Sequence, residues 1–190
     1  MIKIKILQKK FYRNDTKQVA KDLLGKMLVR KIDNQILSGI ITETEAYKGK
    51  NDPASHASKK KTERNKIMFG EVGHAYVYFT YGMHYCFNVV AKKENDESGA
   101  VLIRAIHPQQ GIKRMIKNRK TDIIPNLTNG PGKLTQAMEI TLKQYNLDLT
   151  RNTSLFIVDS KKPRKIIAKP RIGIKEGTDK LWNFSVKNHF

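Results

Sequence analysis

The sequence predicts an α+β fold: a single domain over residues 1–190 with a curved, largely antiparallel sheet, shaped like an open barrel, and peripheral helices. Strand-like segments follow one another at hairpin spacing, and the few helical patterns never alternate with them as in regular βαβ units. No internal repeat and no Gly/Ser-rich or Pro-rich linker divides the 190 residues, a length that suits one domain with a sizeable core.

The first expected elements are a helix and two strands. The helix is expected to begin at Asp15 or Thr16, either of which can cap it, and to end at Gly25. Its apolar positions share one face: Val19, Ala20, Leu23 and Leu24. Two strands joined by a turn follow, and we expect them at 27–29 and 36–47, with the turn at 33–34.

The middle of the chain predicts a hairpin with strands at 76–79 and 85–90 and with Tyr81, Gly82 and Met83 at its tip. A polar turn over 95–99 leads to a strand over 100–106. That strand is expected to break at Pro108, because proline cannot donate a hydrogen bond to a sheet.

The last part predicts two helices and several closing strands. A basic helix is expected over 111–120, and a second helix is marked by Leu134, Ala137, Met138 and Leu142. The closing strands are expected at 155–158, 166–168, 171–174 and 181–186.

The charge balance favours a polyanionic partner. Lys+Arg 37 against Asp+Glu 17 leaves a net charge of +20 and a pI near 10.0, which is typical of nucleic-acid-binding domains. Such a surface attracts phosphate groups and makes affinity fall steeply with salt. The alternative is compositional drift, in which the basic faces are simply solvated.

The single cysteine, Cys86, excludes an intramolecular disulfide and fits a reducing compartment. It lies in an apolar run, so we expect a small buried residue rather than a nucleophile. No signal peptide and no stretch of about 20 apolar residues is present, so no membrane partner is expected. These features predict a cytoplasmic protein, associated with a prokaryotic nucleoid and lacking a targeting signal.

Two carboxylates on one predicted strand are the first candidates for chemistry. Because side chains alternate along a strand, Glu43, Glu45 and Tyr47 share one face and could line a single pocket. Two alternatives stay open: an ordinary solvated strand face, or a metal site that adds His56. The metal reading has no support from ligand spacing, since no His-Glu-x-x-His or Cys-x-x-Cys motif occurs.

The tyrosine-rich hairpin adds a second feature. Tyr76 and Tyr78 share one face of their strand, where cross-strand packing is the plainest interpretation. Tyr81, beside Gly82 at the turn, is expected to be exposed. An exposed aromatic there suits a wedge that enters a stack of bases and unstacks it.

Several dispersed blocks resemble the alkyladenine (3-methyladenine) DNA glycosylases of the mammalian type, from about Phe11 onward. The matching blocks are Glu43-Thr44-Glu45-Ala46-Tyr47, Ala54-Ser55-His56, Thr62 to Asn65 with Met68-Phe69, Gly73 to Val90, Gly99 to Arg104, Gly130 to Ala137 and Arg171 to Ile174. Their number and order make a chance match implausible. Two departures affect loops on the DNA side: Glu63 replaces a proline, and the loop with Lys59, Lys60 and Lys61 is short.

The resemblance implies catalytic roles for three residues and an accessory role for a fourth. Glu45 would be the general base, and Glu43 would be the accessory residue. Arg104 and the backbone carbonyl of Ile172 would help to hold the attacking water.

The resemblance also implies a binding site for a flipped base. Tyr47, His56 and Tyr78 would stack on the base, and the backbone amide of His56 would donate to its edge. Tyr81 would intercalate to fill the gap left in the duplex. Asn88 and Leu102 would line the pocket, and Asn88 would restrict bulky purines.

The implied activity is removal of alkylated purines, such as 3-methyladenine and 7-methylguanine, from damaged double-stranded DNA, which leaves an abasic site. A monofunctional hydrolase is expected, with no cofactor, no metal, no obligate protein partner and a monomeric state. Acceptance of hypoxanthine or ethenoadenine stays open. The competing hypotheses are a non-enzymatic basic nucleic-acid-binding domain and a metal-dependent nuclease built on Glu43, Glu45 and His56.

Overall fold

Strand β2 (Gln35–Lys48) is the longest element of the sheet in the computed structural model, which describes residues 5–160 and 162–186. Eight strands form one sheet in the order β3-β4-β5-β2-β1-β6, while β8 pairs with both β2 and β7. Every pairing is antiparallel. The other strands are β1 (Met27–Ile32), β3 (Ala75–Thr80), β4 (His84–Val90), β5 (Gly99–Gln110), β6 (Leu155–Val158), β7 (Ile166–Lys169) and β8 (Asn183–Val186).

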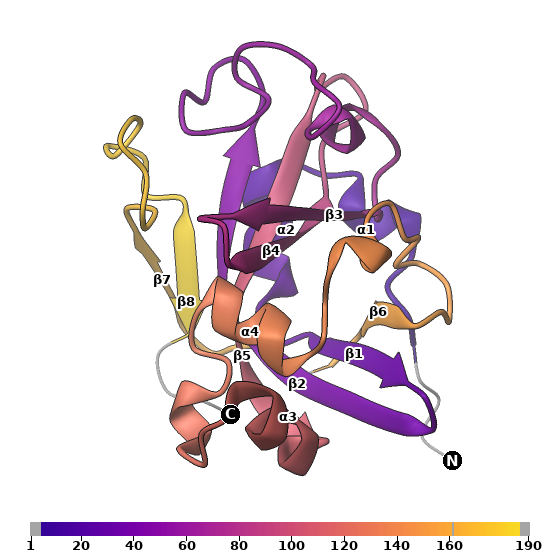
Figure 1. Ribbon diagram of the computed structural model, residues 1–190. Helices are drawn as coiled ribbons and strands as arrows, with labels where there is room; N and C mark the ends of the chain where they lie inside the picture. Colours follow the sequence, from indigo (N-terminus) through magenta and orange to yellow (C-terminus); the bar gives the residue numbers. More distant parts are fainter. Residues whose placement is uncertain (1–4, 161, 187–190) are drawn as a thin grey trace.

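The sheet curls because β2 changes partner along its length. Its first half pairs with β1, up to the pair Met27–Ile40, whereas residues 43–45 pair with β8 on the same edge. The opposite edge follows β5, with irregular register around Glu43. Figure 1 shows β7 and β8 along one side of the sheet and the long loop after β2 at one end. The predicted α+β class with a curved antiparallel sheet is confirmed.

The helices are short and lie at the periphery. They are α1 (Lys9–Tyr12), α2 (Thr16–Leu23), α3 (Ile112–Arg119) and α4 (Pro131–Ala137), with 3₁₀ turns at Lys66–Phe69, Ile124–Asn126 and Leu142–Gln144. Helix α2 packs on β2 and β5, α4 packs on β4, and α3 packs on α4. In the described part of the chain, no helix has the length and apolar character needed to cross a membrane.

The local predictions for the first half are confirmed. Asp15 caps α2 by accepting a hydrogen bond from the backbone N–H of Lys17, and the predicted apolar face of this helix is buried. The turn at 33–34 and the hairpin with Tyr81 at its tip lie where the pattern places them. Cys86 is buried and free, as expected. The predicted domain limits at residues 1 and 190 lie outside the described residues.

Three predictions in the second half are wrong. Strand β5 continues past Pro108, which pairs opposite Gly39 beside a register shift, where a missing N–H is tolerated. Leu142 does not belong to α4 but begins a separate 3₁₀ turn and is exposed. Residues 171–174 form a loop rather than a strand, because the Arg171 side chain is drawn into the interior by a buried ion pair.

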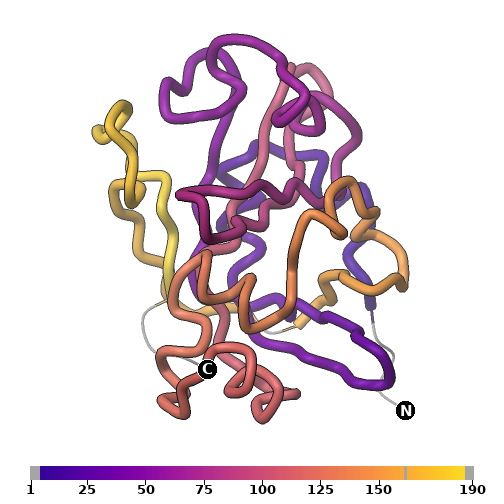
Figure 2. Tube along the Cα trace, in the orientation of Figure 1, coloured from indigo at the N-terminus to yellow at the C-terminus, as the bar shows by residue number. Residues whose placement is uncertain are grey.

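One large apolar cluster stands between the sheet and its covering helices, and it includes Leu23, Ile41, Phe87, Ile103 and Leu134. It holds the central strands rigidly, as close-packed interiors do. Figure 2 shows the C-terminal part of the trace running beside β2, although the two segments are far apart in the sequence. The pocket described next is lined by residues from β2, β3, β4 and β5 and from the loop at 172–174.

Candidate active site

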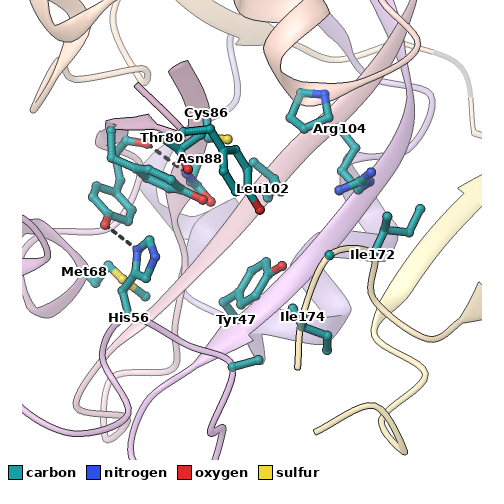
Figure 3. Close-up of a pocket in the computed structure, with 16 residues that line it drawn as sticks. Tyr47, His56, Met68, Thr80, Cys86, Asn88, Leu102, Arg104, Ile172 and Ile174 are labelled. Atoms are coloured by element: carbon teal, nitrogen blue, oxygen red, sulfur yellow. Dashed lines mark hydrogen bonds between the residues drawn. The ribbon is translucent and has the colours of Figure 1, made fainter. Parts of the chain in front are cut away.

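A cavity of about 220 Å³ opens over β2 and β5. Figure 3 shows side chains from strands and loops converging on one space, with Arg104 and Ile172 at one end and His56 and Met68 at the other. The volume is below the roughly 300–1,000 Å³ of pockets for drug-sized ligands, so it suits one small flat ring system. The cavity brings together eight of the predicted site residues: Tyr47, His56, Tyr78, Tyr81, Asn88, Leu102, Arg104 and Ile172.

Glu45 does not itself line the cavity but is fully buried, and it is bonded to two residues that do line it, Tyr47 and Ile172. Its Oε1 atom accepts hydrogen bonds from the backbone N–H of Ile172 at 2.8 Å and from Nδ2 of Asn183 at 3.0 Å. Its Oε2 atom accepts one bond, from the Tyr47 hydroxyl at 2.8 Å. The two oxygens are therefore unequal, and Oε2 has the freer lone pair. This environment excludes the alternative of a solvated strand face for Glu45.

Arg104 joins the two carboxylates of β2. Its Nη1 lies 3.4 Å from Oε1 of Glu45, and its Nε lies 3.3 Å from Oε1 of Glu43. Since side chains alternate along β2, Glu43 and Glu45 share the predicted face, while Thr44 on the other face donates to the carbonyl of Ala20. The guanidinium thus supplies positive charge beside the fully buried carboxylate of Glu45 and the partly buried one of Glu43.

Tyr47 is held from behind by a buried arginine. The Arg171 guanidinium lies 4.7 Å from the centre of the Tyr47 ring and 5.1 Å from the centre of the Trp182 ring. It forms a bidentate pair with Asp52, at 2.6 and 2.7 Å, and donates to the carbonyl of Ala46. Burial, and then the charge of Glu45, raise the pKa of Tyr47, so its hydroxyl stays protonated and donates.

The opposite wall is built from His56, Tyr76 and Tyr78. Nδ1 of His56 is 2.8 Å from the Tyr76 hydroxyl, and the His56 and Tyr78 rings meet edge to face with centroids 4.7 Å apart. Burial, and then the nearby charge of Arg64, lower the pKa of His56 to about 4, so the ring is neutral at neutral pH. Asn65 fixes this loop by donating to the carbonyls of His56 and Lys60.

The floor of the cavity is a cross-strand pair. Asn88 on β4 lies opposite Leu102 on β5, and both are buried. Nδ2 of Asn88 donates to the backbone carbonyl of Tyr76 at 3.1 Å, which fixes the orientation of the amide. A rigid amide and a branched apolar side chain together limit how deep a ligand can enter.

The tip of the β3–β4 hairpin stands out from the rim of the cavity. Tyr81 is 81% exposed and Met83 is 68% exposed, which is unusual for side chains of this size. Tyr81 and Gly82 both have positive φ, at 51° and 65°, so the turn presents the tyrosine outward. The predicted exposure of Tyr81 is confirmed.

The donor set does not suit a metal ion. Among residues 5–160 and 162–186, no group of three His, Cys, Asp or Glu side chains is arranged to hold one. Arg104 already occupies the space between Glu43 and Glu45, and Nδ1 of His56 is engaged with Tyr76. The alternative built on Glu43, Glu45 and His56 thus gains no support from the geometry.

Four contributors escaped the sequence reasoning: Asp52, Tyr76 as a hydrogen-bond partner of His56, Arg171 as the support of Tyr47, and Asn183. Arg171 belongs to one of the blocks that carry the family resemblance, but the sequence pattern predicted a strand there. Asn183 had no local signal, because its partners in β2 are about 140 residues away.

The cavity lined by Tyr47, His56, Tyr76 and Tyr78 is called the slot below. A buried carboxylate bonded to its lining, an exposed tyrosine at its rim and a strongly basic chain suit an enzyme that hydrolyses a bond of an extruded nucleotide. The family model described as methylpurine-DNA glycosylase matches residues 10–190. The chain therefore belongs to the methylpurine-DNA glycosylase family, whose members are DNA repair glycosylases.

Individual relatives agree with this assignment. A Prosthecochloris aestuarii protein named "Putative 3-methyladenine DNA glycosylase" is 50% identical over 175 residues, which cover 90% of this chain and 83% of that protein. Proteins with the same name from Carboxydothermus hydrogenoformans and Methanocella arvoryzae are 47% and 45% identical. The matches cover 97% and 96% of this chain, and 96% and 93% of those proteins, respectively.

Proposed function

We propose that this glycosylase flips an alkylated purine out of duplex DNA into the slot between Tyr47 and the His56–Tyr78 wall. There it hydrolyses the C1′–N bond and leaves an abasic site. The observation that carries the proposal is the position of Glu45, which is fully buried and bonded to two lining residues of the slot, Tyr47 and Ile172, with Oε2 held by a single donor. A carboxylate that acts as a general base is needed where water must be activated away from bulk solvent.

Recognition follows from the cost of flipping and the gain from stacking. Extruding a nucleotide costs a few kcal/mol, and less where damage has weakened pairing. Stacking on aromatic faces returns about 1–3 kcal/mol per base, and the basic surface adds contacts to phosphate. Alkylation at N3 or N7 makes a purine cationic, and a cation is attracted to the face of a tyrosine ring such as Tyr47.

Hydrolysis of the C1′–N bond needs one general base. As the C1′–N bond breaks, the deoxyribose takes on oxocarbenium character and the electron pair leaves with the purine, whose positive charge is thereby neutralised. Glu45 accepts a proton from water at Oε2, while Arg104 and the backbone carbonyl of Ile172 orient that water, whose oxygen bonds to C1′. General-base help of this kind contributes about 10²–10⁴ in rate.

The proposed substrates are 3-methyladenine and 7-methylguanine, whose cationic bases leave without an acid. A neutral lesion such as hypoxanthine or ethenoadenine needs a proton on the departing base. His56 does not supply it at neutral pH, because burial and then Arg64 lower its pKa to about 4. Neutral lesions should therefore be released more slowly than cationic ones.

A monofunctional reaction is proposed because no lysine is among the described residues that line the slot. Without an amine there, no Schiff base to C1′ can form, so the DNA strand stays intact. This outcome also separates the enzyme from a metal-dependent nuclease: base release in EDTA without strand scission is expected.

Glu45→Gln tests the proposal. The variant should bind a duplex with a single alkylated purine as wild type does, yet release base about 10²–10⁴-fold more slowly, because the amide cannot take a proton. Released base is measured by chromatography, and binding by fluorescence anisotropy. Asn118→Leu, far from the slot, serves as control. Normal release from Glu45→Gln would remove Glu45 from this role, and no release from wild type would favour a non-enzymatic binding domain.

The type of glycosylase within the family, the oligomeric state and the cellular location are also proposals. We propose that the chain is of the mammalian type within the family, although the relatives named above come from bacteria and an archaeon. We further propose a monomer that acts on damaged double-stranded DNA without an obligate protein partner, in the cytoplasm beside the nucleoid. Sedimentation of the free protein and of its complex with a short lesion duplex tests the monomer.

A further inference from the structure

Asn183, the first residue of β8, connects the two glutamates of β2. It is fully buried, and its Nδ2 lies 2.7 Å from Oε1 of Glu43 and 3.0 Å from Oε1 of Glu45. Ionised carboxylates only accept hydrogen bonds, so the nitrogen of the amide, and not its oxygen, must face them. One side chain thus donates to both acids at once.

The other end of the amide is unsatisfied. Oδ1 of Asn183 is buried and has no hydrogen-bond partner among the described residues. A buried acceptor left unpaired costs free energy, and an apolar side chain of the same size would avoid that cost. The amide is therefore unfavourable for packing alone, and its benefit must come from the two bonds that Nδ2 donates.

We propose that Asn183 is a positioning residue that keeps Glu45 ionised and oriented by bridging it to Glu43. The inference rests on the proposed function of Glu45. Two carboxylates that share one donor lie close enough to repel, and repulsion favours protonation of one of them. A shared N–H offsets that repulsion, and it also occupies Oε1 so that Oε2 is the oxygen that takes a proton.

The amide of Asn183 is a neutral donor, and this matters because Glu45 is proposed to act as a general base. Arg104 already contacts both acids at 3.3 and 3.4 Å. A second cation would hold both carboxylates ionised more strongly and weaken Glu45 as a proton acceptor, whereas an amide stabilises the ionised form moderately. The charged or titratable groups around Glu45 are Glu43 and Tyr47 on its own strand, Arg104 on β5, Cys86 on β4 and Arg171 before the Ile172 loop.

The consequence is a specific change in pH dependence. Base release requires ionised Glu45, so the rate falls as pH drops and the carboxylate becomes protonated. Without the Asn183 donor, the protonated form of Glu45 becomes more favourable. The acid limb of the pH–rate profile therefore moves to higher pH. A shift of one pH unit lowers the rate at a fixed acidic pH about tenfold.

The experiment measures single-turnover release of 7-methylguanine from a lesion duplex across acidic and neutral pH. Asn183→Leu keeps a side chain that branches at Cγ and removes the donor, and its acid limb should move up by about one pH unit. Asn183→Asp is isosteric and adds a third acid, so its limb should move at least as far. The double variant Glu43→Gln/Asn183→Leu removes the repulsion and should return the limb toward wild type.

Asn118→Leu is the matched control. Asn118 also donates to a carboxylate, that of Glu139 at 2.8 Å, but it lies on α3, and its variant should leave the pH profile unchanged. An unchanged limb in folded Asn183→Leu or Asn183→Asp would overturn the inference, as would failure of the double variant to reverse the shift. Loss of folding in both single variants would also count against it, since it would assign Asn183 a structural role. Failure of the proposed function is recognised separately, because wild type would then release no base.

Discussion

The hydroxyl of Tyr47 donates its hydrogen to Oε2 of Glu45 across 2.8 Å. Tyr47 therefore forms a wall of the slot with its ring, and its hydroxyl oxygen contacts Glu45, the proposed general base. Stacking and chemistry are coupled through this bond, because a ring that shifts to accommodate a purine also moves a donor of the carboxylate. The opposite ring face is covered by the Arg171 guanidinium, which limits that movement.

Tyr47→Phe separates the two roles. The ring remains, so affinity for a lesion duplex should stay at the wild-type level, while loss of the donor should move the acid limb of base release to higher pH. Tyr47→Leu removes the aromatic face and should weaken binding by about 1–3 kcal/mol. Binding by anisotropy and single-turnover release distinguish the variants. Equal weakening of binding in both would contradict a stacking role for the ring.

Tyr81→Ser should impair flipping without affecting stability. The side chain is 81% exposed, so its removal leaves the core intact. Release from duplex DNA should slow, whereas release from a single-stranded lesion oligonucleotide, which needs no wedge, should be unchanged. Leu142→Ser, another exposed apolar residue, is the control. Unchanged duplex rates would refute the intercalation role.

Arg171→Met should be strongly destabilising. It leaves the buried Asp52 carboxylate without its bidentate partner, a loss worth about 3–5 kcal/mol when an ion pair is fully buried. Urea denaturation measures the change. The double variant Arg171→Met/Asp52→Leu should recover much of the stability, because no charge is then left unpaired. By contrast, Glu63→Gln breaks the exposed Glu63–Lys66 pair and should leave the midpoint unchanged.

His56 should make the fold sensitive to acid. Its pKa is about 4 in the folded protein and 6.5 for the free side chain, so the unfolded chain binds a proton that the folded protein does not. Stability contributed by this group should therefore decrease as pH falls from about 6.5 to about 4. His56→Gln, which keeps a polar partner for Tyr76, should flatten the dependence of Tm on pH over this window. An unaltered slope would exclude His56 as the cause.

The elements that the sequence predicted well depend on near neighbours. The Asp15 cap and the apolar face of α2 involve residues within two turns, and the shared face of Glu43, Glu45 and Tyr47 follows from strand alternation alone. Arg104, Ile172, Asn88 and Leu102 had no such pattern, and their places in the site were predicted only from the family resemblance. The structure gathers them around one cavity, and their roles remain predictions.

The elements that were predicted wrongly, and the residues that were missed, depend on distant partners. Residues 171–174 have a composition suited to a strand, but Asp52, 119 residues earlier, draws Arg171 inward and leaves a loop. Pro108 stays within β5 because the pairing opposite it is already irregular. Contacts of this kind are set by tertiary packing, which overrides local propensity.

The pairing of β8 with β2 has a consequence for biosynthesis. Asn183 meets Glu45 across 138 residues of chain, and the backbone of Ile172 meets it across 127. During translation, Glu45 is therefore surrounded by its full set of donors only after residue 183 has left the ribosome and docked. A chain that ends before Asn183 therefore lacks one of the donors that surround Glu45.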